Sequence, residues 1–125
     1  MMNAAEARAH LERVKDLQDA FKPAAVRWYA CEVVETALGN GWVWPDEVGL
    51  DGLAEEDKNC VGSVYRWLVH VGLLCRSAHF RRSEAEGAKG RTIFRYDLVC
   101  YALARTFLDR QGHEQPAPRQ EEMAL

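Results

Sequence analysis

The sequence predicts an α+β fold that is mainly helical, and three observations lead to this prediction. Apolar residues recur at three- and four-residue steps in several stretches, which is typical of amphipathic helices. Two β-prone runs flank a polar segment with two glycines, which is typical of a β-hairpin. The 125 residues, of which 48% are hydrophobic, suit one packed core.

A first helix is expected over residues 3–21, where apolar residues form a stripe. Pro23 ends this helix and begins the next one, at a position where its missing N–H costs little. The stripe has to be buried, either against the helix expected at 97–110 or against its own copy across a two-fold axis. A homodimer through the N-terminal and C-terminal helices is therefore one expectation. The stripe contains Ala4, Ala7, Leu11, Val14 and Phe21, with Leu17 beside it.

The next elements follow from turn residues. A more apolar helix is expected over 24–38, and "GNG" at 39–41 is a strong stop signal. "WVW" at 42–44 is short, β-prone and bracketed by Gly and Pro, which indicates a short strand. "PDEVGL" then begins a short helix with Pro and two acids in its first turn, which the helix dipole favours.

The helix expected over residues 56–72 has an apolar stripe and a polar face. Gly62 lies inside it and costs up to about 1 kcal/mol relative to Ala, so it indicates close approach of another backbone, from protein or DNA. Gly72 ends the helix. The stripe, which must face the core, consists of Val61, Val64, Tyr65, Leu68 and Val71. The polar face consists of Lys58, Asn59, Ser63, Arg66 and His70.

Two strands are expected at 73–82 and 91–98, joined by the polar segment "SEAEGAKG". The tip of this hairpin is basic and contains two glycines. A flexible basic tip suits contacts with phosphate or insertion into a minor groove, because cations displace condensed counterions. The flanking cations are Arg81 and Arg82 on entry, and Lys89 and Arg91 on exit.

A last helix is expected over 97–110. Residues 111–125 are polar and contain prolines, so a flexible tail is expected there. The candidate inward positions of the helix are Leu98, Tyr101, Ala102 and Leu108.

From "PDEV" onward, the order of elements resembles winged-helix domains of phage and bacterial proteins. The resemblance covers residues 24–97. It implies a winged helix-turn-helix domain over 23–110 with extra N-terminal (1–22) and C-terminal helices, a recognition helix at about 56–72 and a basic wing at about 81–91. The residues that carry it are Gly62, Tyr65-Arg66, the Gly72-Leu73-Leu74 turn, Ser83 and Gly90-Arg91.

Such a domain is expected to bind double-stranded DNA without enzymatic activity, as a small transcriptional regulator or replication accessory protein of a phage or prokaryote. Asn59, Ser63 and Arg66 are candidates for reading base edges in the major groove, and Lys58 for contacting phosphate. A merely solvated polar face is the alternative. The candidate DNA-binding residues are Lys58, Asn59, Ser63, Arg66, His70, Arg81, Arg82, Lys89 and Arg91.

The charge is distributed unevenly. Residues 58–95 contain eight Lys or Arg against two acids, a local charge of +6; because the whole chain carries −3, the rest carries −9. This acidic remainder favours a second hypothesis, in which the same fold acts without DNA as a protein-interaction adaptor or as a phage-type inhibitor of a host factor.

Several other classes find little support. No apolar run approaches the roughly 20 residues that span a bilayer, and the N-terminus does not resemble a signal peptide, so a cytoplasmic location in a prokaryotic or phage-infected cell is expected. The four cysteines are irregularly spaced, which predicts buried reduced thiols. Cys75 and His79 would lie about 13 Å apart on a strand, too far to share a metal ion. No cofactor motif is present.

Overall fold

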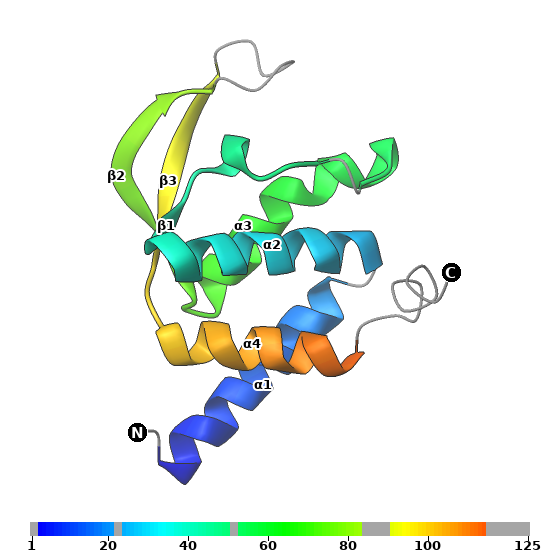
Figure 1. Ribbon diagram of the computed structural model, residues 1–125, viewed down its shortest axis with the longest axis vertical. Coiled ribbons are helices and arrows are strands. Elements are labelled where there is room, and N and C mark those ends of the chain that lie inside the picture. The colour runs from blue at the N-terminus through cyan, green and yellow to red at the C-terminus, as the bar shows by residue number, and fades with distance from the viewer. Residues whose placement is uncertain (1–2, 22–23, 51–52, 84–90, 115–125) are drawn as a thin grey trace.

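The computed structural model describes residues 3–21, 24–50, 53–83 and 91–114, with side chains as far as Arg110. Over these residues the chain is α+β and mostly helical, which confirms the predicted class (Figure 1). The elements are α1 (Ala4–Ala20), α2 (Ala24–Asn40), β1 (Trp42–Val43), the 3-10 helices η1 (Pro45–Glu47) and η2 (Glu55–Cys60), α3 (Val61–His70), β2 (Leu74–Arg82), β3 (Thr92–Leu98) and α4 (Tyr101–Glu114).

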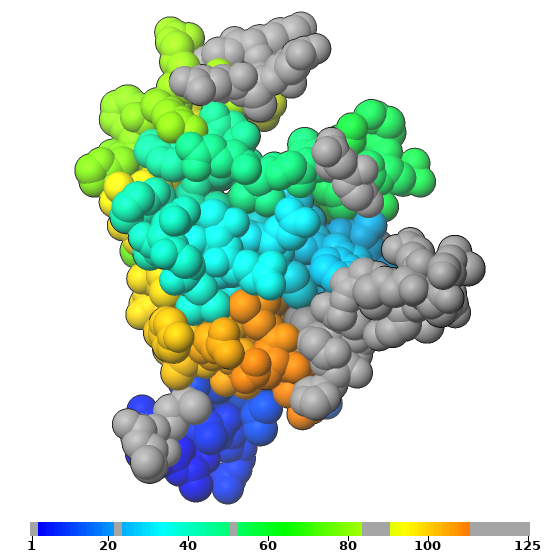
Figure 2. Space-filling view, viewed as in Figure 1, coloured from blue at the N-terminus to red at the C-terminus, as the bar shows by residue number. Residues whose placement is uncertain are grey.

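The described strands form an antiparallel sheet in the order β1-β3-β2. Val43 lies opposite Tyr96, and β2 pairs with β3 from Leu74 opposite Leu98 to Arg82 opposite Thr92. We call residues 74–83 and 91–98 the arm, because they project beyond the helices (Figure 1). The space-filling view shows α2 and α4 covering one face of the molecule below the arm (Figure 2).

One hydrophobic core joins all four α-helices to the sheet. α1 packs against α4, and the rings of Phe21 and Phe107 meet edge to face with centroids 6.4 Å apart. The apolar side of α1 is therefore buried against the last helix of the same chain. This was one of the two expected partners, the other being a second copy of α1. At its start, Asn3 and Glu6 form a capping box, with the Glu6 N–H donating to the Asn3 side chain over 2.8 Å.

The predicted stripe of α1 is partly wrong. Leu11 is 45% exposed, and His10 is buried instead, together with Val14, Leu17 and Phe21. The buried positions still follow helical spacing, but they lie on a neighbouring line that includes a histidine. A polar residue at a core position gives no apolar signal in the sequence.

The prediction for the last helix is partly wrong in its inward face. β3 continues through Leu98, so α4 begins only at Tyr101, whose side chain is 62% exposed. Leu98 and Leu108 do pack against the core, as predicted, and Ala102 is half-buried. The helix also runs to Glu114, past the predicted end at 110, and residues 115–125 of the expected tail lie outside the described residues. Its fully buried side chains are Leu103, Ala104 and Phe107.

The segment predicted as one helix over 56–72 is a 3-10 helix followed by an α-helix. Neither η2 nor α3 has a side-chain cap at its start. Lys58 and Asn59 lie on the 3-10 turns of η2, before α3 begins. The apolar stripe is confirmed, with Val61 packed against the core and the others buried. Those buried members are Val64, Tyr65, Leu68 and Val71.

Two further findings bear on the expectations. Among the helices in the described ranges, none is long and apolar enough to cross a membrane. All four cysteines are free thiols, and of these only Cys31 is buried, whereas Cys75 is exposed on β2. The prediction that the cysteines are buried is therefore wrong for Cys75, because it sits on the outward side of an edge strand.

Candidate nucleic-acid interface

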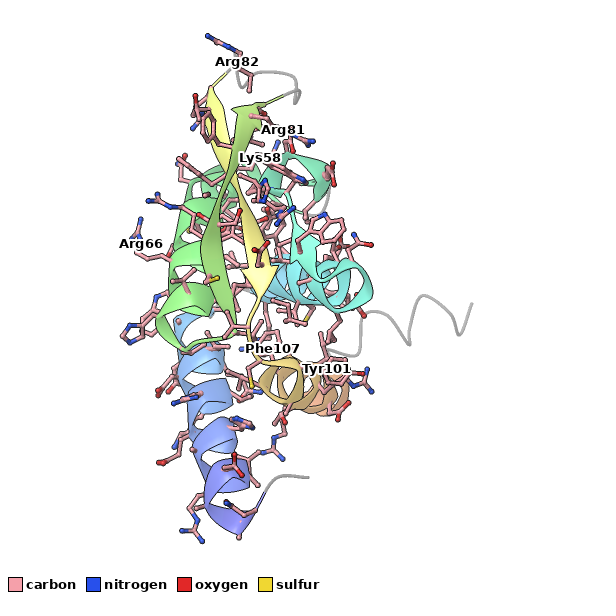
Figure 3. The ribbon with its side chains drawn as sticks, turned by 90° about the vertical axis from the view of Figure 1, so that its left-hand side faces the viewer. Lys58, Arg66, Arg81, Arg82, Tyr101 and Phe107 are labelled. Carbon is pink, nitrogen blue, oxygen red and sulfur yellow. The ribbon has the colours of Figure 1, made fainter. Side chains whose placement is uncertain are left out.

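The polar face of α3 points away from the body of the molecule. When the molecule is turned by 90°, α3 lies to the left of the base of the sheet and α2 to the right, and Arg66 projects outward from α3 (Figure 3). Arg66 and His70 are exposed, and Ser63 is half-buried. α3 therefore presents this part of the predicted polar face to solvent, and the Trp67 and His70 rings meet edge to face on it, with centroids 5.4 Å apart.

A groove of about 620 Å³ lies between the start of α3 and β3. Lys58, Asn59 and Gly62 line one side of it, and Arg91 lines the other. The fold thus brings together residues predicted separately from the helix and from the hairpin, more than thirty positions apart in sequence. Aromatic side chains of Tyr65, Phe94 and Tyr96 form its apolar lining.

The aromatic lining is anchored in the core. The Tyr65 ring stacks on the Tyr96 ring with centroids 4.9 Å apart, and the Tyr65 hydroxyl lies 2.8 Å from the Tyr29 hydroxyl. Burial raises the pKa of Tyr29 to about 12 and also raises the pKa of Tyr65. Both hydroxyls therefore stay neutral at ordinary pH and fix α3 against α2 and β3.

Gly62 faces open space on this surface. A Cβ atom added to it would meet no heavy atom of the described residues within 4 Å, apart from its own helix backbone and chain neighbours. Of the two explanations for a glycine inside this helix, close approach of another part of the protein finds no support in the described part of the chain. The open space leaves room for another molecule to approach the backbone at this position.

Arg81 is engaged inside the chain. Its guanidinium donates to the Asp46 carboxylate over 2.8 Å and to the Glu47 carboxylate over 3.0 Å, and stacks 4.2 Å above the Trp44 ring. The hydrogen bond to Asp46 is the main cause of a raised Arg81 pKa. Because the Asp46 side chain is only 4% exposed, this contact anchors the arm to η1.

Of the other described cations, Lys58 lies on η2, and Arg82, Arg91 and Arg95 lie on the arm. Lys58 pairs with Glu55 at 3.0 Å on the surface, and Arg95 pairs with Asp97 at 2.9 Å. Arg82 and Arg91 are exposed, and Arg82 points outward from the far end of the arm (Figure 3). Lys89 and the hairpin tip at 84–90 lie outside the described residues.

Sequence reasoning missed two features of this surface. The partners of Arg81 lie 34 and 35 residues away, so no local pattern indicates them. An exposed cluster on the arm was missed as well: Arg76, Phe80 and Phe94 lie together, although the pairing of β2 with β3 is irregular between Arg76 and Phe80. The one signal that the sequence offers is the alternation of side chains between the two faces of a strand. This alternation does not hold across such an irregularity.

No group of three or more His, Cys, Asp or Glu side chains in the described part of the chain is placed to hold a metal ion. Comparison of the chain with protein-family models, with curated proteins and with solved structures gives no match in any of the three.

Proposed function

We propose that this chain is a winged-helix protein that binds double-stranded DNA, without enzymatic activity, in the cytoplasm of a prokaryotic or phage-infected cell. The order α2-β1-η1-η2-α3-β2-β3 and the sheet order β1-β3-β2 are compatible with that layout. The observation that carries the proposal is the groove in which Lys58, Asn59 and Gly62 of the helical side face Arg91 of the arm. Regulation of transcription and assistance in replication are the two roles proposed.

In this proposal α3 enters the major groove with its exposed face. Asn59, Ser63 and Arg66 contact base edges, where amide, hydroxyl and guanidinium groups match donors and acceptors of the bases. Lys58 and His70 contact the backbone at the two ends of the helix. Phosphates are also bound by Arg82 and Arg91 of the arm and by Lys89 of the segment between its two strands, while Arg81 serves mainly to hold the arm in place.

The helical part has an unusual form for such a domain. The turns η1 and η2 stand where a full α-helix is expected before a recognition helix, and η2 runs directly into α3. Three acids, Glu55, Glu56 and Asp57, lie in the first turn of η2. This acidic start would repel phosphate, so DNA has to approach α3 from the side of Gly62 and Arg66.

A titration of fluorescent duplex DNA at several salt concentrations tests the proposal. We expect binding at about 50 mM salt that weakens steeply as salt increases, because counterions are released from the phosphates. Asn59→Ala and Arg66→Ala should reduce the preference for the best sequence over random sequence. Absence of binding at low salt, or binding that does not change with salt, would contradict the proposal.

A second candidate function is a protein-interaction adaptor or an inhibitor of a host factor. Two observations favour it: Lys58, Arg81 and Arg95 already have acidic partners in the chain, and residues outside 58–95 carry a net charge of −9. A pull-down with and without nuclease discriminates the two functions. A partner that is retained after nuclease treatment, and lost when Arg66 and Arg91 are replaced by Glu, supports the adaptor.

Homodimerisation through α1 and α4 stays a prediction. The buried side of α1 is already covered by α4, so a dimer would use outer residues such as Leu11 and Tyr101, which are 45% and 62% exposed. Light scattering of the purified protein, with Leu11→Glu as a variant, measures whether such a dimer forms.

A further inference from the structure

The arm carries an aromatic patch that does not belong to the core. We define the aromatic patch as Arg76, Phe80 and Phe94. The Phe80 side chain is 65% exposed, and its ring lies 5.9 Å from that of Phe94 at an angle of 56°. The Arg76 guanidinium lies 4.5 Å from the centre of the Phe94 ring.

The register explains how these three side chains meet. Phe80 pairs with Phe94, and Arg76 pairs with Tyr96, so all lie on one side of the sheet. The irregularity between Arg76 and Phe80 keeps both of them beside Phe94, although they are four residues apart. Tyr96 faces α3 on this same side, since its ring stacks on that of Tyr65.

The patch therefore continues the proposed DNA surface. Phe94 lines the groove at the start of α3, and Phe80, directly opposite it, extends the aromatic surface across the sheet onto the edge strand β2. Phe80 is absent from the core and from the side chains packed against it, and its contact with Phe94 leaves 65% of it exposed. An exposed ring beside a candidate binding groove is better explained by a ligand than by packing.

The charge around the patch indicates the chemistry of that ligand. Of the five arginines in the described residues of the arm, Arg81 and Arg95 are held in ion pairs, and Arg76 and Arg82 lie on the same side as Phe80. Aromatic rings interleaved with arginines are typical of surfaces that bind single-stranded nucleic acid, where rings stack on bases and cations hold phosphates. An uncharged apolar partner would not need this set of cations.

We propose that the aromatic patch stacks on unpaired bases, so that the protein prefers DNA in which an opened or single-stranded stretch adjoins a duplex. This inference rests on the proposed DNA binding and names its substrate class. α3 holds the duplex part, and the arm, which projects beyond α3, reaches the unpaired part (Figure 1). Stacking on one base corresponds to a gain of about 5- to 150-fold in affinity.

The test compares two DNA ligands of equal length. One is a perfect duplex, and the other has a short central stretch of mismatched bases; binding is followed by fluorescence anisotropy at fixed salt. We expect the wild-type protein to bind the mismatched DNA at least 5-fold more tightly. Phe80→Ala should abolish that preference while leaving affinity for the perfect duplex within about 2-fold. Phe80→Trp should keep the preference, because its ring also stacks.

Tyr101→Ala is the matched control, since it removes an aromatic ring of similar exposure on α4, away from the arm. It should leave the ratio of the two affinities unchanged, because any effect through a dimer would act on both DNA ligands alike. Circular dichroism checks that each variant folds; Phe80 is exposed, so its loss should not unfold the chain. Phe94→Ala is less informative because Phe94 also supports Arg76 and the groove.

The outcomes separate this inference from the proposed function. If the wild-type protein binds neither DNA, the proposed function fails and this inference fails with it. If it binds both DNA ligands equally, or if Phe80→Ala keeps the preference, only the aromatic patch is excluded as a base-stacking surface. Loss of a nuclease-resistant protein partner in Phe80→Ala, with unchanged DNA affinities, would overturn the inference in favour of a protein-docking role.

Discussion

At the scale of single residues, the hydroxyl groups of Tyr29 and Tyr65 connect α2 to α3 beneath the candidate interface. Their oxygens are 2.8 Å apart and both residues are buried. Each hydroxyl satisfies the other, so the pair is a polar contact inside an otherwise apolar region. Because Tyr65 also lines the groove, this contact determines how α3 is presented.

Replacing both tyrosines of this pair should cost less than the sum of the two single replacements. In Tyr29→Phe or Tyr65→Phe, the remaining buried hydroxyl loses its partner, and we expect the free energy of unfolding to fall by about 1–3 kcal/mol. In the double variant no hydroxyl is left unsatisfied, so its loss should be clearly smaller than the sum of the two single losses. Urea denaturation of the four proteins measures this coupling, and additive losses would contradict it.

The same pair predicts a loss of stability at alkaline pH. An unfolded tyrosine ionises around its ordinary pKa of 10.0, whereas burial raises the pKa of Tyr29 to about 12 and that of Tyr65 as well. Between these values the unfolded state binds fewer protons than the folded state, so stability is complete below pH 10 and falls as pH increases toward 12. The free energy of unfolding should decrease less steeply over this range in the double Phe variant; equal slopes would exclude the pair as a cause.

At the scale of elements, one glycine lies inside α3 and another follows its end, and the two have different roles. Gly72 follows the helix with a φ of 84°, and the N–H groups of Gly72 and Leu73 donate to the carbonyls of Val69 and Leu68 over 3.0 Å each. This is a Schellman motif, in which glycine avoids the strain of a left-handed backbone. Gly62 has no positive φ and faces open space, so neither the turn chemistry nor the described packing requires it.

Gly62→Ala should therefore stabilise the protein and weaken DNA binding at the same time. Alanine favours a helix by up to about 1 kcal/mol relative to glycine, whereas its methyl group would hinder close approach of a DNA backbone. Gly39→Ala is the matched control, since Gly39 also lies in a helix with no heavy atom within 4 Å of the added Cβ, but on α2. Both variants should melt at a higher temperature, and only Gly62→Ala should lose affinity. Unchanged affinity would mean that no ligand approaches Gly62.

Prediction from sequence succeeded where one element is governed by its own pattern. The core stripe of α3, the start of α2 and the two long strands follow from periodicity and from Gly and Pro positions. Prediction failed where tertiary contacts decide which side chains are buried. His10 is buried although it is polar, and Tyr101 is exposed although it is aromatic. The groove was not predictable, because its two sides belong to segments that meet only in the folded chain.

At the scale of the whole molecule, folding separates the cations of the basic segment by their partners. Arg81 is committed to Asp46 and Glu47, and Arg95 to Asp97, so the +6 charge of residues 58–95 overstates the positive charge offered to DNA. Arg66 is exposed on α3, and Arg91 is exposed beside the groove. With few phosphate contacts, affinity should depend on salt less steeply than in strongly basic proteins.

This division predicts different effects for two equal changes of charge. Arg91→Gln should lower the slope of log affinity against log salt by about one, because one phosphate contact is lost. Arg81→Gln removes the same charge but should leave the slope unchanged and lower the free energy of unfolding by about 1–2 kcal/mol, because it loses charge-assisted hydrogen bonds to Asp46 and Glu47.

Arg81→Lys covers the case in which Arg81→Gln does not fold. It keeps the charge but loses the two-point grip and the stacking on Trp44, so it should be less stable than the wild-type protein with the same salt slope. Slopes come from anisotropy titrations of one duplex at several salt concentrations, and stabilities from urea denaturation. A salt slope that falls equally in Arg81→Gln and Arg91→Gln would mean that the ion pairs of Arg81 open when DNA binds, and that the arm is released from η1 in the complex.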